Sequence, residues 1–331
     1  MKKIFFLFPF ILLSCSKNRL IEKKYTFFPL HTVVNITLVD SDINKIKRGK
    51  RIVEDEFRRV ERKFGIFNKE SEIFLINRFA GIKPVKVSSE VIKLIKFSIE
   101  FSRKTSGMFD IAIAPLEFLW GFYEGYEKKV PNKKELEKVL KLVNYKNIVI
   151  DENKGTVFLK KKGMEIDLSS FIKGYAVDKV IEKLKKVGLK GCLVEAGGDL
   201  RFFGRNLRGR KWRIGIRHPR RLNEIYKIIE LDDRAVATSG DYENYFVKNG
   251  ERYHHILNPE TGYPVKDIVS VTVVAKDCIT ADLLSTAIFV LGKEKGLRLA
   301  NKMENVDALI VYEEGGKLKR VCSKNFNRFT F

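Results

Sequence analysis

No glycine fingerprint for a nucleotide occurs in the 331 residues. Neither GxGxxG, which marks dinucleotide-binding folds, nor GxxxxGK followed by Ser or Thr, which marks phosphate-binding loops, is present. Both patterns bring backbone N–H groups close to phosphates. A nucleotide ligand would therefore have to be bound in another way. The chain also has no repeat with a period of about 20 to 50 residues and no low-complexity linker.

Cysteine is scarce, with four residues and no CxxC spacing. When Cys15 is set apart for the reason given below, Cys192, Cys278 and Cys322 remain, an odd number without a disulfide framework. Cys192 and Cys278 lie in apolar runs, where a free cysteine behaves as a small core residue. We expect neither a zinc site nor a catalytic thiol.

Length and composition describe a globular protein. A hydrophobic content of 44% and a charged content of 32% exclude a disordered chain, and the length suits one large domain or two closely joined ones. Lys and Arg number 64 against 41 Asp and Glu, which gives a formal net charge of +23. This excess predicts an anionic partner, which could be a nucleotide, a nucleic acid or a phospholipid surface.

The first 15 residues predict export. Lys2 and Lys3 precede ten apolar residues, too few for the about 20 that span a bilayer but typical of a signal peptide. The following Leu-Leu-Ser-Cys resembles a bacterial lipobox, after which Cys15 carries a lipid; a plain secretory signal is the alternative. We therefore expect a signal over residues 1–15, a tether over 16–28, a folded domain over 29–331, and a lipid-anchored place in the cell envelope, facing the periplasm or exterior. Export argues against nucleic acid as partner.

Hydrophobic periodicity predicts helices and antiparallel hairpins in irregular alternation. Strand-like alternation starts at Val34, and apolar residues at helical spacing mark helices over residues 50–64 and 89–104. Asn132 and Glu135 form a near capping box for a helix to about Val143, and residues 147–160 predict a hairpin. This order of elements predicts an α+β fold.

The segment after Asp167 is a candidate anion site. It leads into an apolar helix that ends at Gly188, and Lys173 lies near the start of that helix. Because the helix dipole already makes this end positive, an anion there would be held by backbone N–H groups and Lys173 together; a solvated surface lysine is the alternative. Shortly after, Gly197 and Gly198 interrupt an apolar strand over 192–203, which often marks the close approach of a ligand or another backbone.

Two histidines lie in the most polar part of an otherwise apolar region, residues 235–292. His254 and His255 precede the turn signal at 258–262, and Ser239-Gly240-Asp241 has the composition of a tight turn. Histidine titrates near neutral pH, so one of the pair is a candidate acid or base, although such a pair is more often structural.

A carboxylate and a hydroxyl share one face of the next predicted helix, over residues 281–291. Asp282 and Thr286 are four residues apart and follow a β-branched run over 269–275. Polar groups on an apolar face are costly to bury unpaired, and Mg²⁺, which prefers oxygen ligands, would explain both. The alternative is that Asp282 caps the helix and Thr286 bonds back to a carbonyl.

Together these segments resemble the FAD:protein FMN transferase family, also called the ApbE family, in its bacterial lipoprotein form. The resemblance covers about residues 29 to 313. It rests on motifs in family order: Gly107-Met108-Phe109-Asp110, Leu119-Trp120-Gly121-Phe122, Asp167-Leu168-Ser169-Ser170 with residues 173–178, Gly197-Gly198-Asp199, residues 237–242, His255-Ile256 with Pro259 and Thr261-Gly262, and Ala281-Asp282 with Thr286-Ala287. It implies T-fold-like mixed sheets with flanking helices in one compact, two-lobed body.

The resemblance also implies a reaction: FMN moves from FAD to a Thr or Ser hydroxyl of a membrane or exported flavoprotein, with Mg²⁺, and AMP is released. The implied metal ligands are Asp282, Thr286 and the backbone carbonyl of Ser170. His255 matches the family's functionally important histidine and is our candidate base, with Asp241 and Asp282 as alternatives. The implied FAD contacts are Leu30, Phe67, Met108, Phe109, Asp110, Asp167, Lys173 and Ile256.

The sequence departs from the family pattern at two positions. Leu30-His31-Thr32 stands where the family usually has Met-Gly-Thr, so an imidazole replaces a glycine beside the expected flavin. Phe67 stands where many members have a tyrosine, which keeps the ring and loses the hydroxyl. Two alternative functions therefore stay open: an Mg²⁺-dependent pyrophosphatase that splits FAD into FMN and AMP, and an exported flavin-binding lipoprotein without turnover.

Overall fold

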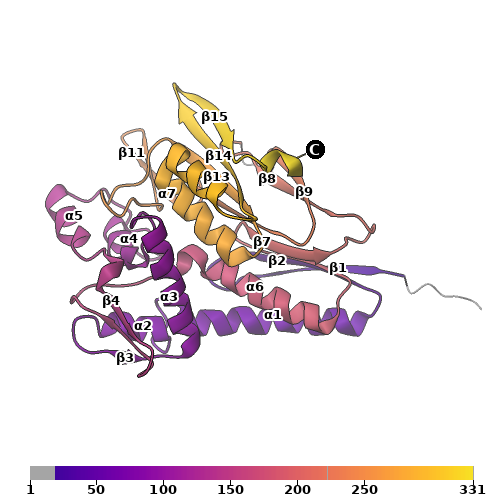
Figure 1. The fold of residues 1–331 in the computed structure, drawn as a ribbon, viewed down its shortest axis with the longest axis horizontal. Helices are drawn as coiled ribbons and strands as arrows, with labels where there is room; N and C mark the ends of the chain where they lie inside the picture. Colours follow the sequence, from indigo (N-terminus) through magenta and orange to yellow (C-terminus); the bar gives the residue numbers. More distant parts are fainter. Residues whose placement is uncertain (1–18, 222, 331) are drawn as a thin grey trace, which may run out of the picture.

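The computed structural model describes residues 19–221 and 223–330; the predicted signal and Cys15 lie outside these ranges. Its centre is an eight-stranded sheet in the order β1-β2-β6-β7-β10-β13-β14-β15 (Figure 1). Every neighbouring pair in it is antiparallel. The strands are β1 (Ile21–Phe27), β2 (Val34–Asp40), β6 (Gly191–Ala196), β7 (Asp199–Gly204), β10 (Ala235–Gly240), β13 (Ile268–Ala275), β14 (Asp307–Glu314) and β15 (Lys317–Cys322).

Both faces of this sheet are covered. Helices α1 (Ile43–Phe64), α6 (Ser169–Val187) and α7 (Cys278–Lys302) pack on one another and on the sheet. On the other face lies a separate hairpin of β8 (Trp212–Arg217) and β9 (Ile225–Leu231). Its apolar residues form a second cluster with residues of the eight-stranded sheet. β13 is buried at all eight positions, and all of its residues except Ser270 are apolar or β-branched, in place of the alternation of a half-exposed strand. No helix of the described chain is long and apolar enough to cross a membrane.

Apart from η3, which packs against β9 and β14, the remaining elements lie toward one end of α1 (Figure 1). The helices are α2 (Glu72–Arg78), α3 (Ser89–Lys104), α4 (Ala114–Trp120) and α5 (Lys133–Leu140). Beside them lies a three-stranded sheet of β3 (Val85–Lys86), β5 (Thr156–Leu159) and β4 (Ile148–Asp151), and a hairpin is formed by β11 (Tyr245–Lys248) and β12 (Glu251–His254). Short 3-10 turns occur at η1 (Ile111–Ile113), η2 (Tyr145–Asn147) and η3 (Phe326–Phe329).

The α+β prediction is confirmed, and so are the strand from Val34, the helix over 89–104 and the hairpin near 150. Asn132 and Glu135 form the predicted capping box, but α5 ends at Leu140, three residues before Val143. Helix α1 begins seven residues earlier than predicted, at Ile43 rather than 50, because the Asp42 side chain caps it by accepting the Asn44 N–H. Cys192 and Cys278 are buried core residues, as expected.

The predicted tether over 16–28 is wrong for Ile21–Phe27. This segment is β1, which pairs residue by residue with β2 from Ile21 opposite Asp40 to Phe27 opposite Val34. An edge strand has a neighbour on one side only and exposes polar side chains to solvent, so its composition resembles that of a linker. The expected single strand over 192–203 is also wrong, since Gly197 and Gly198 form the turn between β6 and β7.

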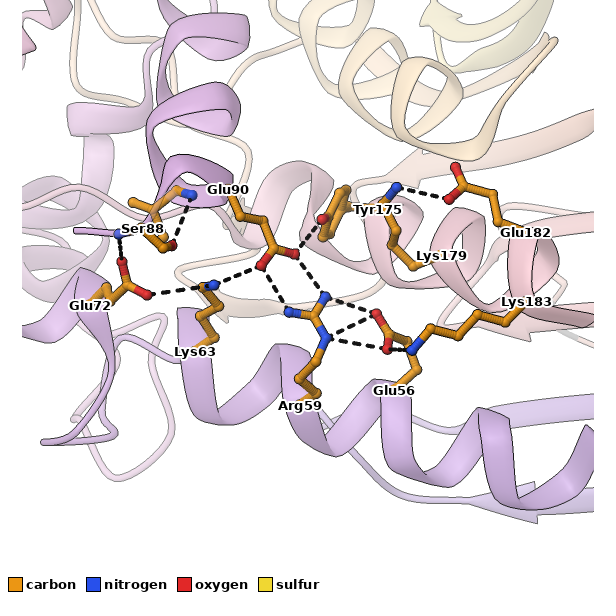
Figure 2. A network of polar contacts seen from close by, with 11 residues as sticks. Glu56, Arg59, Lys63, Glu72, Ser88, Glu90, Tyr175, Lys179, Glu182 and Lys183 are labelled. Carbon is orange, nitrogen blue, oxygen red and sulfur yellow. Dashed lines mark hydrogen bonds and ion pairs between the residues drawn. The ribbon is translucent and has the colours of Figure 1, made fainter. Parts of the chain in front are cut away.

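Charged side chains join α1, α3 and α6 in one network (Figure 2). Glu56 on α1 is 1% exposed and accepts hydrogen bonds from Arg59, at 2.8 Å, and from Lys183 on α6. Arg59 also donates to both oxygens of Glu90 in the first turn of α3, at 2.7 and 2.9 Å. Tyr175 on α6 donates to the same Glu90 carboxylate. The network therefore connects α1 and α6, which pack on the eight-stranded sheet, with α3, which belongs to the elements at the end of α1.

Replacing Arg59 with alanine is expected to destabilise the fold, because the buried Glu56 carboxylate then keeps only Lys183 and loses its link to Glu90. Breaking a buried ion pair costs about 3 to 5 kcal/mol. Since the Arg59 side chain is 34% exposed, we expect a loss of about 2 kcal/mol in the free energy of unfolding, measured in urea. Arg58→Ala, at an exposed position of the same helix, is the control and should cost less than about 0.5 kcal/mol. Equal losses would contradict the role of the network.

Acidification should weaken the network through Glu90. Burial by itself would raise the pKa of Glu90, but hydrogen bonds from Arg59, Lys63 and Tyr175 outweigh it and lower the pKa from 4.5 to about 2. Because the folded-state pKa is the lower one, this stabilisation is present above the unfolded pKa of 4.5 and is lost as the pH falls through about 2. Unfolding free energies measured across this window should therefore fall more steeply for the wild-type chain than for Glu90→Gln; parallel curves would refute the assignment.

Candidate active site

A cavity of about 1050 Å³ opens between the eight-stranded sheet with its helices and the smaller elements at the end of α1. Its lining comes from the end of α1, the residues before α4, the start of α6, the β6–β7 turn, the end of β10, the segment after β12, and α7. Every FAD, metal and catalytic residue that the resemblance implied lines it: Leu30, Phe67, Met108, Phe109, Asp110, Asp167, Ser170, Lys173, His255, Ile256, Asp282 and Thr286. The fold thus brings together side chains that are more than 200 residues apart in the sequence.

Lys173 is the cation of this cavity's inner wall. Its Nζ lies 2.7 Å from Oδ2 of Asp199, whose side chain is 2% exposed. Burial would lower the pKa of Lys173, but the charges of Asp199 and Asp282 outweigh burial and raise it. The alternative of a solvated surface lysine is therefore wrong. In the sequence, Asp199 is marked only by its position directly after Gly197-Gly198, a pattern that is typical of a close approach between the chain and a ligand or another backbone.

Helix α6 meets α7 at Gly174. A Cβ there would lie 2.5 Å from the Cys278 carbonyl oxygen and 2.9 Å from Cβ of Asp282, so only glycine fits. The Gly174 N–H donates to Asp282 Oδ2 at 3.0 Å. In a regular helix this N–H would donate to the Ser170 carbonyl. Because this N–H donates to Asp282, the Ser170 carbonyl oxygen is a candidate acceptor for another partner.

Asp282 is not a helix cap. The cap of α7 is Asp277, whose side chain accepts the Thr280 N–H at 3.0 Å, and the helix begins at Cys278 rather than at 281. Asp282 lies in the second turn, 3% exposed. Burial and the charge of Asp199 raise its pKa well above the ordinary value. Thr286, one turn further, lies 3.2 Å from the hydroxyl of Ser239 at the end of β10.

The oxygen groups here fit Mg²⁺. The described chain contains no group of three or more His, Cys, Asp and Glu that could hold a metal, so the candidate set is one carboxylate, Asp282, with the Thr286 hydroxyl and the Ser170 carbonyl. Mg²⁺ binds through one or two carboxylates and completes its shell with water and substrate phosphates. Asp199 and Asp282 also outnumber Lys173, their cationic neighbour, and a cation would offset that negative charge.

The two histidines differ in how many of their ring nitrogens have a hydrogen-bond partner. His254 uses both: Nε2 contacts the Val265 carbonyl at 2.8 Å, and Nδ1 accepts the Ile256 N–H at 3.3 Å. His255 contacts the Asn244 carbonyl through Nδ1, at 3.3 Å. A carbonyl accepts only, so this contact fixes the proton on Nδ1 and leaves Nε2 with its lone pair. Burial, and then the neighbouring His254, lower the pKa of His255 to about 4, so the ring is neutral at physiological pH.

Asp241 is excluded as the alternative base. Both of its oxygens accept from Arg220, at 2.6 and 2.7 Å, and Arg252 lies 3.5 Å away. The predicted tight turn is also wrong in part, because Ser239 and Gly240 complete strand β10. Asp241 is also absent from the residues that line the cavity, so it does not face the place of the reaction.

Several of the implied FAD contacts have structural partners of their own. Asp110 accepts the N–H groups of Ala112 and Tyr145, both at 2.8 Å, and burial raises its pKa to about 6 against these bonds. Phe109 is 3% exposed and packs near Phe101. The Ile256 carbonyl accepts the Val265 N–H at 3.1 Å. Their contacts with FAD stay predictions.

The two departures from the family pattern lie at the cavity. Leu30 and His31 both have φ of 53°, a left-handed conformation that favours glycine, and Nδ1 of His31 lies 3.2 Å from Glu124. Phe67 is 46% exposed and meets Tyr123 edge-on, with ring centroids 5.2 Å apart. Its ring is thus held by a second aromatic while part of it stays open for stacking.

Sequence reasoning missed Glu117 and Tyr123, which line the cavity beside Asp167. Tyr123 Oη lies 2.6 Å from Glu117 and 2.9 Å from Asp167. The available signal was Glu117 itself, the one charged residue of α4, whose sequence is APLEFLW.

The sequence matches the model of the ApbE family over residues 30–310. Its relatives include proteins named FAD:protein FMN transferase from Haemophilus influenzae, 34% identical and covering 84% of this chain and 82% of the relative, and from Vibrio cholerae, 35% identical and covering 80% and 79%. Among solved structures, the ApbE protein of Thermotoga maritima has a TM-score of 0.86 at 38% identity, covering 94% of this chain and 100% of that one. For flavin transferase ApbE from Vibrio cholerae the values are 0.84, 30%, 94% and 99%. The resemblance seen in the sequence is therefore confirmed, and this chain belongs to the ApbE family.

Proposed function

We propose that this protein transfers FMN from FAD to a Thr or Ser hydroxyl of a membrane or exported flavoprotein and releases AMP, with Mg²⁺. The observation that carries the proposal is the single cavity in which Lys173, His255, Asp282 and Thr286 meet. Family members named FAD:protein FMN transferase support the reaction class. In this reaction the hydroxyl oxygen bonds to the FMN phosphorus, the bond from that phosphorus to the bridging oxygen breaks, and AMP leaves with that oxygen.

The start of α6 is the natural place for the pyrophosphate. The positive end of the helix dipole favours an anion there, and Lys173 adds a charge that Asp199 keeps in position. Ser170, Asp282 and Thr286 would hold Mg²⁺ beside it. The ion, when bound, offsets negative charge on the phosphates and on the leaving AMP oxygen.

His255 acts as the base in this proposal. Its Nε2 lone pair is available, because Nδ1 carries the proton toward Asn244. A pKa of about 4 makes the neutral form dominant but also makes the ring a weak base. The negative pyrophosphate nearby would favour the imidazolium that forms when the hydroxyl proton is taken.

The proposed location of this protein is the cell envelope. A lipid on Cys15 would hold the protein to a membrane six residues before β1 begins at Ile21. The anchored protein would face the compartment in which exported flavoproteins fold. Detection of a diacylglyceryl group on Cys15 by mass spectrometry, lost in Cys15→Ala, is the direct support for this location.

The decisive assay uses the full-length chain, FAD, Mg²⁺ and an exported flavoprotein that contains a target threonine. FMN attached to the acceptor, detected by mass spectrometry, supports transfer. Free FMN and AMP at the same rate without an acceptor would favour the pyrophosphatase instead. Tight FAD binding without either product would leave a flavin-binding lipoprotein.

Replacing Asp282 with alanine should abolish Mg²⁺-dependent AMP release, because it removes the carboxylate from the candidate metal ligands. AMP is measured by chromatography over a series of Mg²⁺ concentrations. Asp233→Asn, at an exposed acid that pairs with Lys185, is the matched control and should behave as the wild-type chain does. Unchanged release in Asp282→Ala would show that the metal assignment is wrong.

Replacing His255 with glutamine should slow transfer by about 10²- to 10⁴-fold, the usual contribution of a general base. Gln can still donate to the Asn244 carbonyl, so FAD binding should change little. Single-turnover transfer followed by mass spectrometry gives the rate, and quenching of FAD fluorescence gives the affinity. A loss of affinity with an unchanged rate constant at saturating FAD would make His255 a binding residue instead.

A further inference from the structure

Three polar side chains in the cavity wall form a chain that the transfer steps above do not use. Tyr123 Oη lies 2.6 Å from Glu117 Oε2 and 2.9 Å from Asp167 Oδ2. Glu117 belongs to α4, Tyr123 follows that helix, and Asp167 precedes α6. The chain thus joins two elements that are about 50 residues apart in the sequence.

The hydrogen bonds require one proton more than Tyr123 supplies. A phenol carries a single proton and donates to one acceptor, so one of the two carboxyl groups must donate in the other contact. Asp167 has a donor at each oxygen: its Oδ1 receives the Ser169 N–H at 2.9 Å, and its Oδ2 lies 2.9 Å from the Tyr123 hydroxyl. Within the described residues, Tyr123 is the hydrogen-bond partner of the Glu117 side chain and no other is found. The extra proton therefore belongs on Glu117.

The electrostatics of the cavity agree with this placement. Burial, and then the charge of Asp167, raise the pKa of Glu117 to about 8, against the hydrogen bond with Tyr123. Burial and both carboxylates raise the pKa of Tyr123 as well. Around neutral pH the Glu117 O–H donates to Tyr123, and the Tyr123 O–H donates to Asp167.

We propose that Glu117 is a neutral carboxylic acid that orients Tyr123, and that the pair holds the Asp167 carboxyl group in position as an acceptor for FAD. The inference rests on the proposed function, which brings FAD to Asp167. Glu117 and Tyr123 are positioning residues in this arrangement, because Asp167 is the group assigned to contact the ligand.

Neutrality at Glu117 also suits an anionic ligand. The other ionisable side chains that line the cavity are His31, Glu61, Arg62, Asp110, Glu124, Lys173, Asp199, Glu243, His255 and Asp282. Acids are the majority, and a further negative charge would repel a pyrophosphate. Loss of the Glu117 proton at higher pH therefore breaks the hydrogen-bond chain and adds repulsion, and both effects weaken FAD binding.

The first test measures the dissociation constant of FAD for the full-length chain by fluorescence quenching, without acceptor or Mg²⁺. From about pH 6 to about pH 9 we expect roughly tenfold weaker binding, with a midpoint near the Glu117 pKa, since one pKa unit of interaction corresponds to a factor of ten. Glu117→Gln keeps a donor to Tyr123 and should flatten the profile. Tyr123→Phe should bind FAD more weakly throughout. Glu124→Gln, at an acid of the same cavity that is 85% exposed, is the control and should retain the step.

The second test detects the proton on Glu117 in the absence of any ligand. Difference infrared spectra of the wild-type chain across the pH series should contain a C=O stretch of a protonated carboxyl group that is lost with a midpoint at about pH 8, and this titrating band should be missing in Glu117→Gln. A flat binding profile in the wild-type chain, or a step that persists in Glu117→Gln, overturns the inference. Failure to bind FAD at any pH overturns the proposed function, and the infrared band then shows separately whether Glu117 is protonated.

Discussion

The site depends on the contact between α6 and α7 at Gly174. No larger residue fits there, and the Gly174 N–H binds Asp282 directly. Four residues further along α6, Asp178 accepts the N–H groups of Cys278 and Ile279, both at 2.9 Å. These contacts set the first turn of α7 against α6. Because of that register, Asp282 and Thr286 point into the cavity beside Ser170 rather than into the core.

The cavity lies where two groups of elements meet, so its shape depends on what holds them together. The network of Glu56, Arg59 and Glu90 does this within a turn or two of cavity residues on α1 and α6 (Figure 2). Charge-assisted hydrogen bonds constrain the direction as well as the distance between two groups. They therefore fix the positions of the helices that they join more narrowly than apolar contacts do. The network thus orders a wall of the site without taking part in its chemistry.

Charge is distributed unevenly between the surface and the site. The chain as a whole is strongly basic, yet the cavity is rich in carboxyl groups and has Lys173 as its inner cation. Burial allows this arrangement because it changes which groups ionise: it raises the pKa of Glu117 and of Asp282 and lowers that of His255. In the proposed function, Mg²⁺ and the pyrophosphate would be bound together, so that the charge of each would be offset within the site.

Local patterns determined much of this protein from the sequence alone. The capping box at Asn132, the helix over 89–104 and the β-branched run of β13 depend on neighbours a few residues away, so spacing and composition were sufficient. The family motifs then named residues that all line one cavity. Only the tertiary structure decided the pairing of Lys173 with Asp199, the contact with Asn244 that places the His255 proton on Nδ1, and the strand formed by Ile21–Phe27. These features depend on partners brought together from distant parts of the chain and on burial, which shifts protonation, and neither quantity is present in the local order of residues.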